Sequence, residues 1–257
     1  MKKLSVLFTF AVFTVSSFSQ ETGDALRPFS ATIVSTISAG DHPFQLRGRY
    51  AQASDGSNAY ISENDPPAND EGLRGEFSFL LNMRKNLYIH TNSLIRAAVV
   101  TPLVDGEDLK KIQPRHSCKW LADGTWRRVG EGESKIKGIR VIEVIDEETQ
   151  TPELTRLITL WVAPDLNCFQ MKRTHVKNGV MVAEDIVESL DLKEPTSAIF
   201  DVPLGYSNVR PAEFERLYRV KFPGKQIYSD DMVMRFESQY QRAIDKAGAR
   251  PLPSHKK

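Results

Sequence analysis

The sequence predicts a mainly β protein built on one large antiparallel sheet. Most of the chain after residue 28 consists of short runs in which β-branched or aromatic residues alternate with polar ones, the pattern of strands with one buried face. Lys177-Asn178-Gly179 joins two of these runs, and Asn-Gly favours a tight hairpin because both central positions of a type I′ turn need a positive φ. The helical patterns stand after or between the strand runs instead of alternating with them, which favours an antiparallel sheet over a parallel α/β fold.

The strand runs can be followed in order along the chain. We expect strands over 29–38, 43–53, 59–61, 74–83, 86–91, 94–104, 136–145, 154–163, 167–176 and 180–192. A polar loop over 64–72 contains two adjacent prolines and cannot lie inside a sheet. A short helix over 107–113 and a turn-rich stretch over 114–134 follow the sixth run. A sheet of about nine or ten strands is expected to curl or close.

Two helical patterns come at the end of the chain. Residues 210–219 and 230–247 have helical periodicity, and Ser229 or Asp230 can cap the second helix. The apolar residues of the second helix form one stripe, Val233, Phe236, Tyr240, Ala243 and Ile244. The stripe predicts a helix packed on the protein's own sheet, although a helix that binds a partner has the same pattern. We therefore expect a β domain over 20–228, a C-terminal helix over 229–247 and a disordered tail over 248–257.

The N-terminus predicts export. Two lysines precede an apolar segment of 12 residues from Leu4 to Val15, and small residues at the −3 and −1 positions predict cleavage before Gln20. As a helix this segment would rise about 18 Å, against a hydrocarbon core of about 30 Å, so a signal peptide over 1–19 is favoured over a membrane anchor. No other stretch approaches the length of an apolar membrane span, so the mature chain is expected to have none.

Charge and motifs exclude several classes of function. The chain has 34 Lys and Arg residues against 33 Asp and Glu residues, and loss of the signal peptide would leave 32 basic residues against the same 33 acidic ones. This balance argues against a nucleic-acid-binding protein. The sequence has no nucleophile elbow, zinc-protease motif or nucleotide-binding loop, and its five histidines are scattered, so we expect neither catalysis nor a cofactor.

Cys118 and Cys168 are the only cysteines. In an oxidising compartment they can pair, and a disulfide that closes a loop of about 50 residues would stabilise the fold by about 4 kcal/mol. The alternatives are two separate buried or free thiols, and a metal site that uses His116 and Cys118. No second cluster of His or Cys completes a four-ligand site, so no metal is expected.

The strands between 139 and 163 are apolar on both faces. Along 139–145, Val141 lies on one face of the strand, and Ile142 and Val144 lie on the other. Residues 157–163 likewise have apolar residues on both faces. An antiparallel strand that faces water on one side carries polar residues there. Each face must therefore be covered by a helix, a second sheet or a bound apolar ligand. The three tryptophans fit either a plain core or the wall of a lipid pocket: Trp120, Trp126 and Trp161.

Four short motifs follow one another between residues 136 and 214. Residues 159–166 read Thr-Leu-Trp-Val-Ala-Pro-Asp-Leu, and residues 198–206 read Ala-Ile-Phe-Asp-Val-Pro-Leu-Gly-Tyr. Between them lie Phe169-Gln170-Met171-Lys172 and a strand that ends in Glu188-Ser189-Leu190-Asp191-Leu192. In this order the segment resembles the C-terminal half of the outer-membrane lipoprotein carrier and receptor superfamily, the LolA/LolB-like periplasmic proteins.

The resemblance implies an unclosed antiparallel β-barrel, a half-barrel of about 9–11 strands with a few plugging or flanking helices, including a C-terminal helix. It also implies a periplasmic location and a concave apolar cavity that binds a lipid or the acyl chains of lipoproteins, without catalysis. A related regulatory branch contacts an anti-sigma factor, so the alternative is an envelope protein partner bound through the C-terminal helix or a sheet edge. The candidate residues of the cavity wall are Phe77, Phe79, Ile142, Val144 and Trp161.

One feature of the superfamily has no counterpart at the expected place. The carriers usually begin with an amphipathic helix before the first strand, but only about nine residues separate the predicted cleavage site from the first strand run at Phe29. The helix over 230–247 is the candidate that could plug the half-barrel instead.

Overall fold

The computed structural model describes residues 26–38, 43–64, 75–103, 126–129, 134–151 and 154–248. The predicted signal peptide with its cleavage site, the predicted helix over 107–113, Cys118 and all but the first residue of the predicted tail lie outside these described residues.

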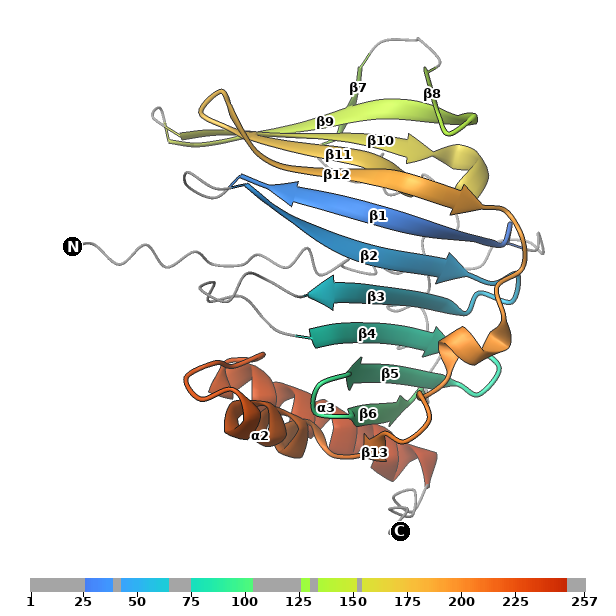
Figure 1. Cartoon of the computed structure of the whole chain (residues 1–257), viewed down its shortest axis with the longest axis vertical. Helices are drawn as coiled ribbons and strands as arrows, with labels where there is room; N and C mark the ends of the chain where they lie inside the picture. Colours follow the sequence, from blue (N-terminus) through green and yellow to red (C-terminus); the bar gives the residue numbers. More distant parts are fainter. Residues whose placement is uncertain are drawn as a thin grey trace.

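One sheet of 13 strands dominates the structure (Figure 1). The strands are β1 (Phe29–Ile37), β2 (Phe44–Gln52), β3 (Asn58–Asn64), β4 (Gly75–Asn82), β5 (Leu87–Asn92), β6 (Ala97–Pro102), β7 (Arg127–Arg128), β8 (Ser134–Ile136), β9 (Ile139–Thr151), β10 (Leu154–Ala163), β11 (Phe169–Lys177), β12 (Val180–Asp191) and β13 (Ser207–Asn208). Their order across the sheet is β13-β6-β5-β4-β3-β2-β1-β12-β11-β10-β9-β7, and β8 pairs with β9 off this path. Among the described strands, β13 with β6 is the only parallel pair. The strand order has two free ends, which confirms the predicted mainly β, unclosed antiparallel sheet.

The strand count exceeds the prediction because of short elements. The ten long strands match the ten predicted runs, whereas β7, β8 and β13 have only two or three residues each. Two helices follow the sheet-forming part of the chain, α2 (Pro211–Lys221) and α3 (Asp230–Ala247). The predicted C-terminal helix is thereby confirmed as part of the fold.

Two tight turns form hairpins in the second half of the sheet. Asn178 and Gly179 have φ values of 50° and 76°, as the predicted type I′ turn between β11 and β12 requires. The strand predicted over 136–145 matches β9 from Ile139 on, but its predicted start was wrong, because Lys137 and Gly138 form a second turn of this kind, with φ values of 52° and 78°, between β8 and β9. Lys-Gly is a weaker turn pattern than Asn-Gly, and the glycine is the residue that adopts a positive φ without strain.

β1 joins two meanders into one sheet. Strands β2 to β6 lie on one side of it and strands β9 to β12 on the other (Figure 1). Residues Ser30 to Ile37 pair with β2 on one edge and with β12 on the other. The N-terminal strand therefore lies in the interior of the sheet, next to the last long strand of the chain.

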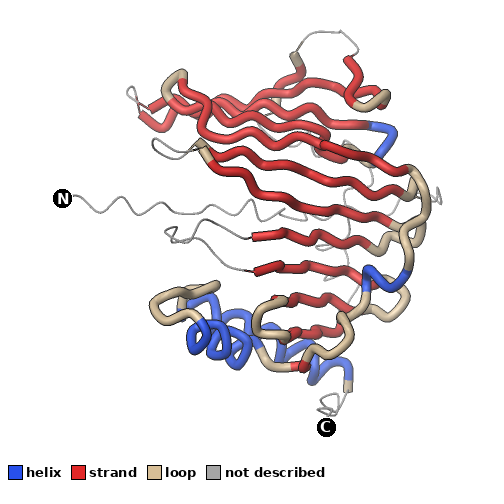
Figure 2. Tube along the Cα trace, in the orientation of Figure 1, coloured by secondary structure: helices blue, strands red, loops and turns tan. Residues whose placement is uncertain are grey.

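The two faces of the first meander have different covers. We call the face on which α2 and α3 pack the helix face. Register places successive helix-face residues from β1 to β6 in one row: Ala31, Tyr50, Tyr60, Phe79, His90 and Val99. We call the opposite face the strap face, because residues 192–206, the strap, cross it at the ends of the strands (Figure 2). Phe200 of the strap is buried there in a cluster with Leu80 and Ile89.

α2 closes one end of the helix face. Its residues Phe214 and Tyr218 are fully buried. The ring of Phe214 lies 4.8 Å from the ring of His90, and the ring of Tyr218 lies 5.9 Å from that of Phe77. These contacts fasten α2 to β4 and β5.

α3 packs against α2 and β6. It begins after Ser229, whose hydroxyl accepts a hydrogen bond from the N–H of Met232 at 3.4 Å, so serine is the cap. Phe236 meets Tyr228 edge to face with ring centroids 4.8 Å apart. Ala243 is the only buried residue of α3, and even it is 9% exposed. The apolar stripe of α3 therefore packs on the protein's own fold, although less deeply than α2.

His90 is enclosed by the rings of this helical cap. Phe79 stacks on it at 4.5 Å with an interplanar angle of 8°, and the Tyr228 hydroxyl lies 2.9 Å from its Nδ1. Burial lowers the pKa of His90 to about 3, so the imidazole is neutral at neutral pH. Buried Glu215 accepts a hydrogen bond from the N–H of Tyr228 at 3.1 Å and pairs with Arg219 at 2.7 Å. The buried carboxylate thus holds Tyr228 against His90.

Replacing Phe214 with Ala should lower the free energy of unfolding by about 3–5 kcal/mol, because a fully buried ring is lost and a cavity remains. Urea unfolding followed by circular dichroism measures the change. Leu204→Ala is the control, since Leu204 is 97% exposed and its truncation should change the free energy by less than about 0.5 kcal/mol. Equal losses in the two variants would contradict the docking of α2 on the sheet.

The fold should lose stability as the pH falls below about 6.5. The pKa of His90 is about 3 in the folded state and about 6.5 in the unfolded chain, so in this window only the unfolded chain binds the proton. The free energy of unfolding should fall by up to about 1.4 kcal/mol per pH unit as the pH falls from about 6.5 to 3. Above about pH 6.5, His90 makes its full contribution to the free energy of unfolding.

Carboxylates titrate in the same range, so the measurement is the difference between the wild type and His90→Gln. That difference should shrink with falling pH, because the variant has no imidazole to keep neutral. Parallel pH profiles of the two proteins would show that His90 does not carry the effect.

Candidate functional site

The helices cover the helix face only at one end of the sheet. Figure 1 shows α2 and α3 beside β5, β6 and β13, away from β1, β2 and β12. Their ring contacts reach His90 of β5 and Phe77 of β4. The helix-face side chains of β1 and β2 lie beyond these contacts.

An apolar strip occupies this part of the helix face. Phe44 and Leu46 of β2 are half-buried, whereas the residues that alternate with them, Gln45 and Arg47, are exposed on the opposite face. Ile37 of β1 is the register partner of Phe44 and is also half-buried. We call Ile37, Phe44 and Leu46 the apolar strip. It is apolar surface that is still partly open to solvent.

An ion pair lies beside the apolar strip. Arg173 of β11 and Asp185 of β12 are register partners, and their Nε and Oδ2 atoms are 2.7 Å apart. The same row continues through Ser35 of β1 to Leu46 of β2. The side chain of Asp185 is 10% exposed and that of Arg173 is 27% exposed. The guanidinium is therefore the more open partner of a pair set in the sheet face.

Tyr60 of β3 extends toward this ion pair. A Cβ atom at Gly48 would lie 3.1 Å from the ring and the hydroxyl of Tyr60, so the glycine leaves the space that the tyrosine fills. Burial raises the pKa of Tyr60 above its usual value, the charge of Asp185 adds to the rise, and the charge of Arg173 opposes it. The hydroxyl of Tyr60 is thus within electrostatic range of both charges.

Phe77 and Phe79 belong to the helical cap. Both rings stack on His90, with centroid distances of 6.0 and 4.5 Å. Phe77 also contacts Tyr218 of α2. These two candidate wall residues therefore face protein side chains at the covered end of the sheet, away from the apolar strip.

The other three candidate wall residues lie on opposite faces of β9 and β10. Trp161 pairs in register with Glu143 and donates a hydrogen bond from Nε1 to its carboxylate at 3.1 Å. Ile142 and Val144 lie on the opposite face, in a cluster with Leu160, Val162 and Cys168. The five candidates do not form one wall in this structure, and their role in ligand binding stays a prediction. Two protein clusters, one on each face, account for the apolar pattern of these strands.

Sequence reasoning missed Arg173, Asp185 and Tyr60. Each falls at an ordinary position of a strand run, and only the pairing of β11, β12 and β1 shows that the two charges face the apolar side.

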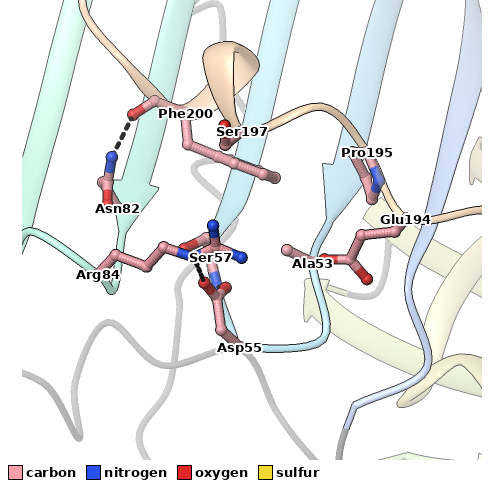
Figure 3. Close-up of a pocket in the computed structure, with 9 residues that line it drawn as sticks. All are labelled: Ala53, Asp55, Ser57, Asn82, Arg84, Glu194, Pro195, Ser197 and Phe200. Atoms are coloured by element: carbon pink, nitrogen blue, oxygen red, sulfur yellow. Dashed lines mark hydrogen bonds and ion pairs between the residues drawn. The ribbon is translucent and has the colours of Figure 1, made fainter.

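A small polar pocket lies beneath the strap (Figure 3). Its volume is about 20 Å³, room for about one water molecule. The Asn82 side-chain amide donates hydrogen bonds to the carbonyl of Phe200 at 3.2 Å and to the carboxylate of Asp201 at 2.8 Å. Arg84 pairs with Asp55 at 2.6 Å on its other side. These bonds fasten the strap to the sheet, and the pocket is too small for an acyl chain.

The outer surface of α3 carries a wider, open depression of about 530 Å³. Its lining residues are Asp231, Met234, Arg235, Ser238, Gln239 and Arg242. All six are exposed, so the depression faces away from the sheet.

Cys168 is disulfide-bonded. Cys118, the only other cysteine of the chain, lies outside the described residues, so the pairing of Cys118 with Cys168 stays a prediction.

In the part of the chain that the structure describes, no group of three or more His, Cys, Asp or Glu residues could hold a metal ion. No helix in that part has both the length and the hydropathy to cross a membrane.

No protein-family model matches the sequence, and no curated protein matches it. Among solved structures, the chain is similar to MucB of Pseudomonas aeruginosa in its complex with MucA, with a TM-score of 0.41 and 14% identity over 71% of this chain. The match spans 58% of that chain, less than two thirds of its length.

Two further structures cover a similar share of this chain. LprF of Mycobacterium bovis gives a TM-score of 0.32 and 11% identity over 66% of this chain and 90% of that one. A LolA superfamily protein of Nitrosomonas europaea gives a TM-score of 0.30 and 9% identity over 68% of this chain and 90% of that one. At such TM-scores these likenesses assign neither a ligand nor a partner. The structures similar to this chain do include a member of the superfamily that the sequence resembles.

Proposed function

We propose that the protein is a periplasmic binding protein that holds an apolar ligand, a lipid or an acyl chain, on the helix face of its half-barrel sheet, without catalysis. The observation that carries the proposal is the apolar strip of Ile37, Phe44 and Leu46, which is half-buried on the central strands β1 and β2, beyond the ring contacts of α2. Apolar surface beside a packed core is typical of ligand-binding faces.

An acyl chain would supply the missing cover. Each CH₂ group moved out of water contributes about 0.8 kcal/mol, so a chain of about 14 carbons offers roughly 11 kcal/mol before the costs of binding. Lipoprotein acyl chains and free lipids share this chemistry, and the apolar strip alone does not favour one over the other.

A second candidate function is the binding of an envelope protein through α3. Met234 is 62% exposed in the depression on the outer surface of this helix. Ala243 is the only buried residue of α3, so the helix presents most of its surface to solvent. Exposed methionines adapt to irregular apolar partners.

The replacement of Leu46 by Glu should abolish lipid binding, because a charge would be placed in the apolar strip. The measurement is native mass spectrometry of protein purified from the periplasm, followed by organic extraction and lipid analysis. We expect lipid at a near-unit ratio in the wild type and little or none in Leu46→Glu.

Gln45→Glu is the matched control, since it adds the same charge one residue away on the opposite, exposed face. It should keep the wild-type lipid ratio. Wild-type protein that carries no lipid, or equal loss in both variants, would count against the proposal. A lipid-free wild type that co-purifies with a protein, and loses it in Met234→Glu, would favour the second candidate.

A further inference from the structure

We infer that the ion pair of Arg173 and Asp185 recognises the carbonyl oxygen of an ester- or amide-linked acyl chain bound on the helix face. The inference rests on the proposed function and deepens it, because it names the polar group that the apolar ligand carries.

The ion pair lies on the same face as the apolar strip, so a ligand that covers the strip would also extend over the ion pair. Leu46 of the strip and the two charged residues belong to the same cross-strand row. Two positions along the same face, Ile33 and Val187 are buried in the core. Apolar residues therefore flank the pair along this face, and a chain that covers the strip comes close to the guanidinium.

The guanidinium has hydrogen-bonding capacity to spare. Its salt bridge to Asp185 joins Nε and Oδ2. Among the described residues, this is the only ion pair or hydrogen bond of the Arg173 side chain. A guanidinium carries five N–H donors, so the two terminal amino groups can still donate. A hydrocarbon chain that covered these N–H groups would remove their hydrogen bonds to water and offer none in return. A ligand with a hydrogen-bond acceptor at this point would replace those bonds.

Because the ion pair has no net charge, it favours a ligand whose hydrogen-bond acceptor is uncharged. Asp185 already neutralises Arg173, and a carboxylate or phosphate on the ligand would bring a second negative charge close to a buried one. The neighbouring pair of Lys172 and Glu184 alternates with these residues and lies on the other face, so it does not change this balance. A carbonyl oxygen accepts from both amino groups and adds no charge.

The test is competition for N-phenyl-1-naphthylamine, a neutral fluorescent probe, bound to the full mature protein. The competitors are methyl dodecanoate, N-methyldodecanamide, dodecanoate and tridecane, all delivered from cyclodextrin. The measured quantity is the affinity of each competitor relative to tridecane. In the wild type the ester or the amide should exceed tridecane by about tenfold or more, as a hydrogen bond to a charged donor provides, and dodecanoate should not exceed them.

The main variant is the double substitution Arg173→Met with Asp185→Leu. Apolar replacement of both partners of a buried ion pair usually preserves stability, whereas removal of one leaves an unpaired charge. The preference for the carbonyl should fall to near unity while tridecane still binds. Arg173→Lys, which keeps the charge but loses the planar donors, should reduce the preference as well. Lys172→Met with Glu184→Leu is the matched control on the other face and should keep it.

Each outcome bears on one of the two ideas. A preference that persists in the double variant, or a dodecanoate affinity above that of the ester and the amide, would overturn the inference and leave the proposed function intact, since tridecane still displaces the probe. Failure of every competitor and of the probe to bind the wild type would overturn the proposed function itself. A preference for the ester alone supports the inference and assigns an ester-linked chain, and one for the amide alone assigns an N-acyl chain.

Discussion

The ladder between β1 and β12 is the constraint on which the rest of the structure depends. It joins a meander of β2 to β6 to a meander of β9 to β12, which would otherwise be two separate sheets. The register of this ladder sets Ser35 opposite Asp185, so the charges of the second meander face the same side as the apolar strip of the first. A bulge between Thr32 and Ile33 keeps Ile33 paired with Val187 in the core. Both the core and the candidate site therefore follow from one long-range pairing.

Buried polar groups of the helical cap are satisfied by the protein itself. His90 has the Tyr228 hydroxyl, and Glu215 has Arg219 together with two backbone N–H groups. Such complete networks hold a fold in one arrangement. The Arg173 guanidinium differs, because its pairing with Asp185 engages only part of its donor capacity and its side chain is partly open to solvent. That difference separates the helical cap, which holds the structure together, from the region where we propose that a ligand binds.

Local patterns explain which parts of the fold could be predicted. Alternation is a property of neighbouring residues, so the ten long strands and the turn at Asn178 and Gly179 could be predicted from the sequence. The hairpin at Lys137 and Gly138 could not, because its turn pattern is weak. Phe77 has the same apolar pattern as a ligand wall, but its cover is α2, and nothing in the sequence says which strands a C-terminal helix will cover. The row of Arg173 and Asp185 needs the register of three strands, which is a tertiary property.

Ligand binding and folding are linked through the same ladder. On the strap face, the pair Arg47–Glu188 spans β1, but both side chains are about half exposed, and such pairs contribute at most about 1 kcal/mol. The strap packs on β3 and β4, and its Glu194 accepts a hydrogen bond from the N–H of Ser54 at 3.2 Å, so it also ties the end of β12 to the first meander. An acyl chain on the helix face would touch Leu46 of the first meander and Arg173 of the second. It would therefore bridge the junction between the meanders, and its binding free energy would add to the stability of the folded protein by mass action. Under the proposed function, the loaded protein would therefore be more stable than the empty one, because the ligand would contact both meanders.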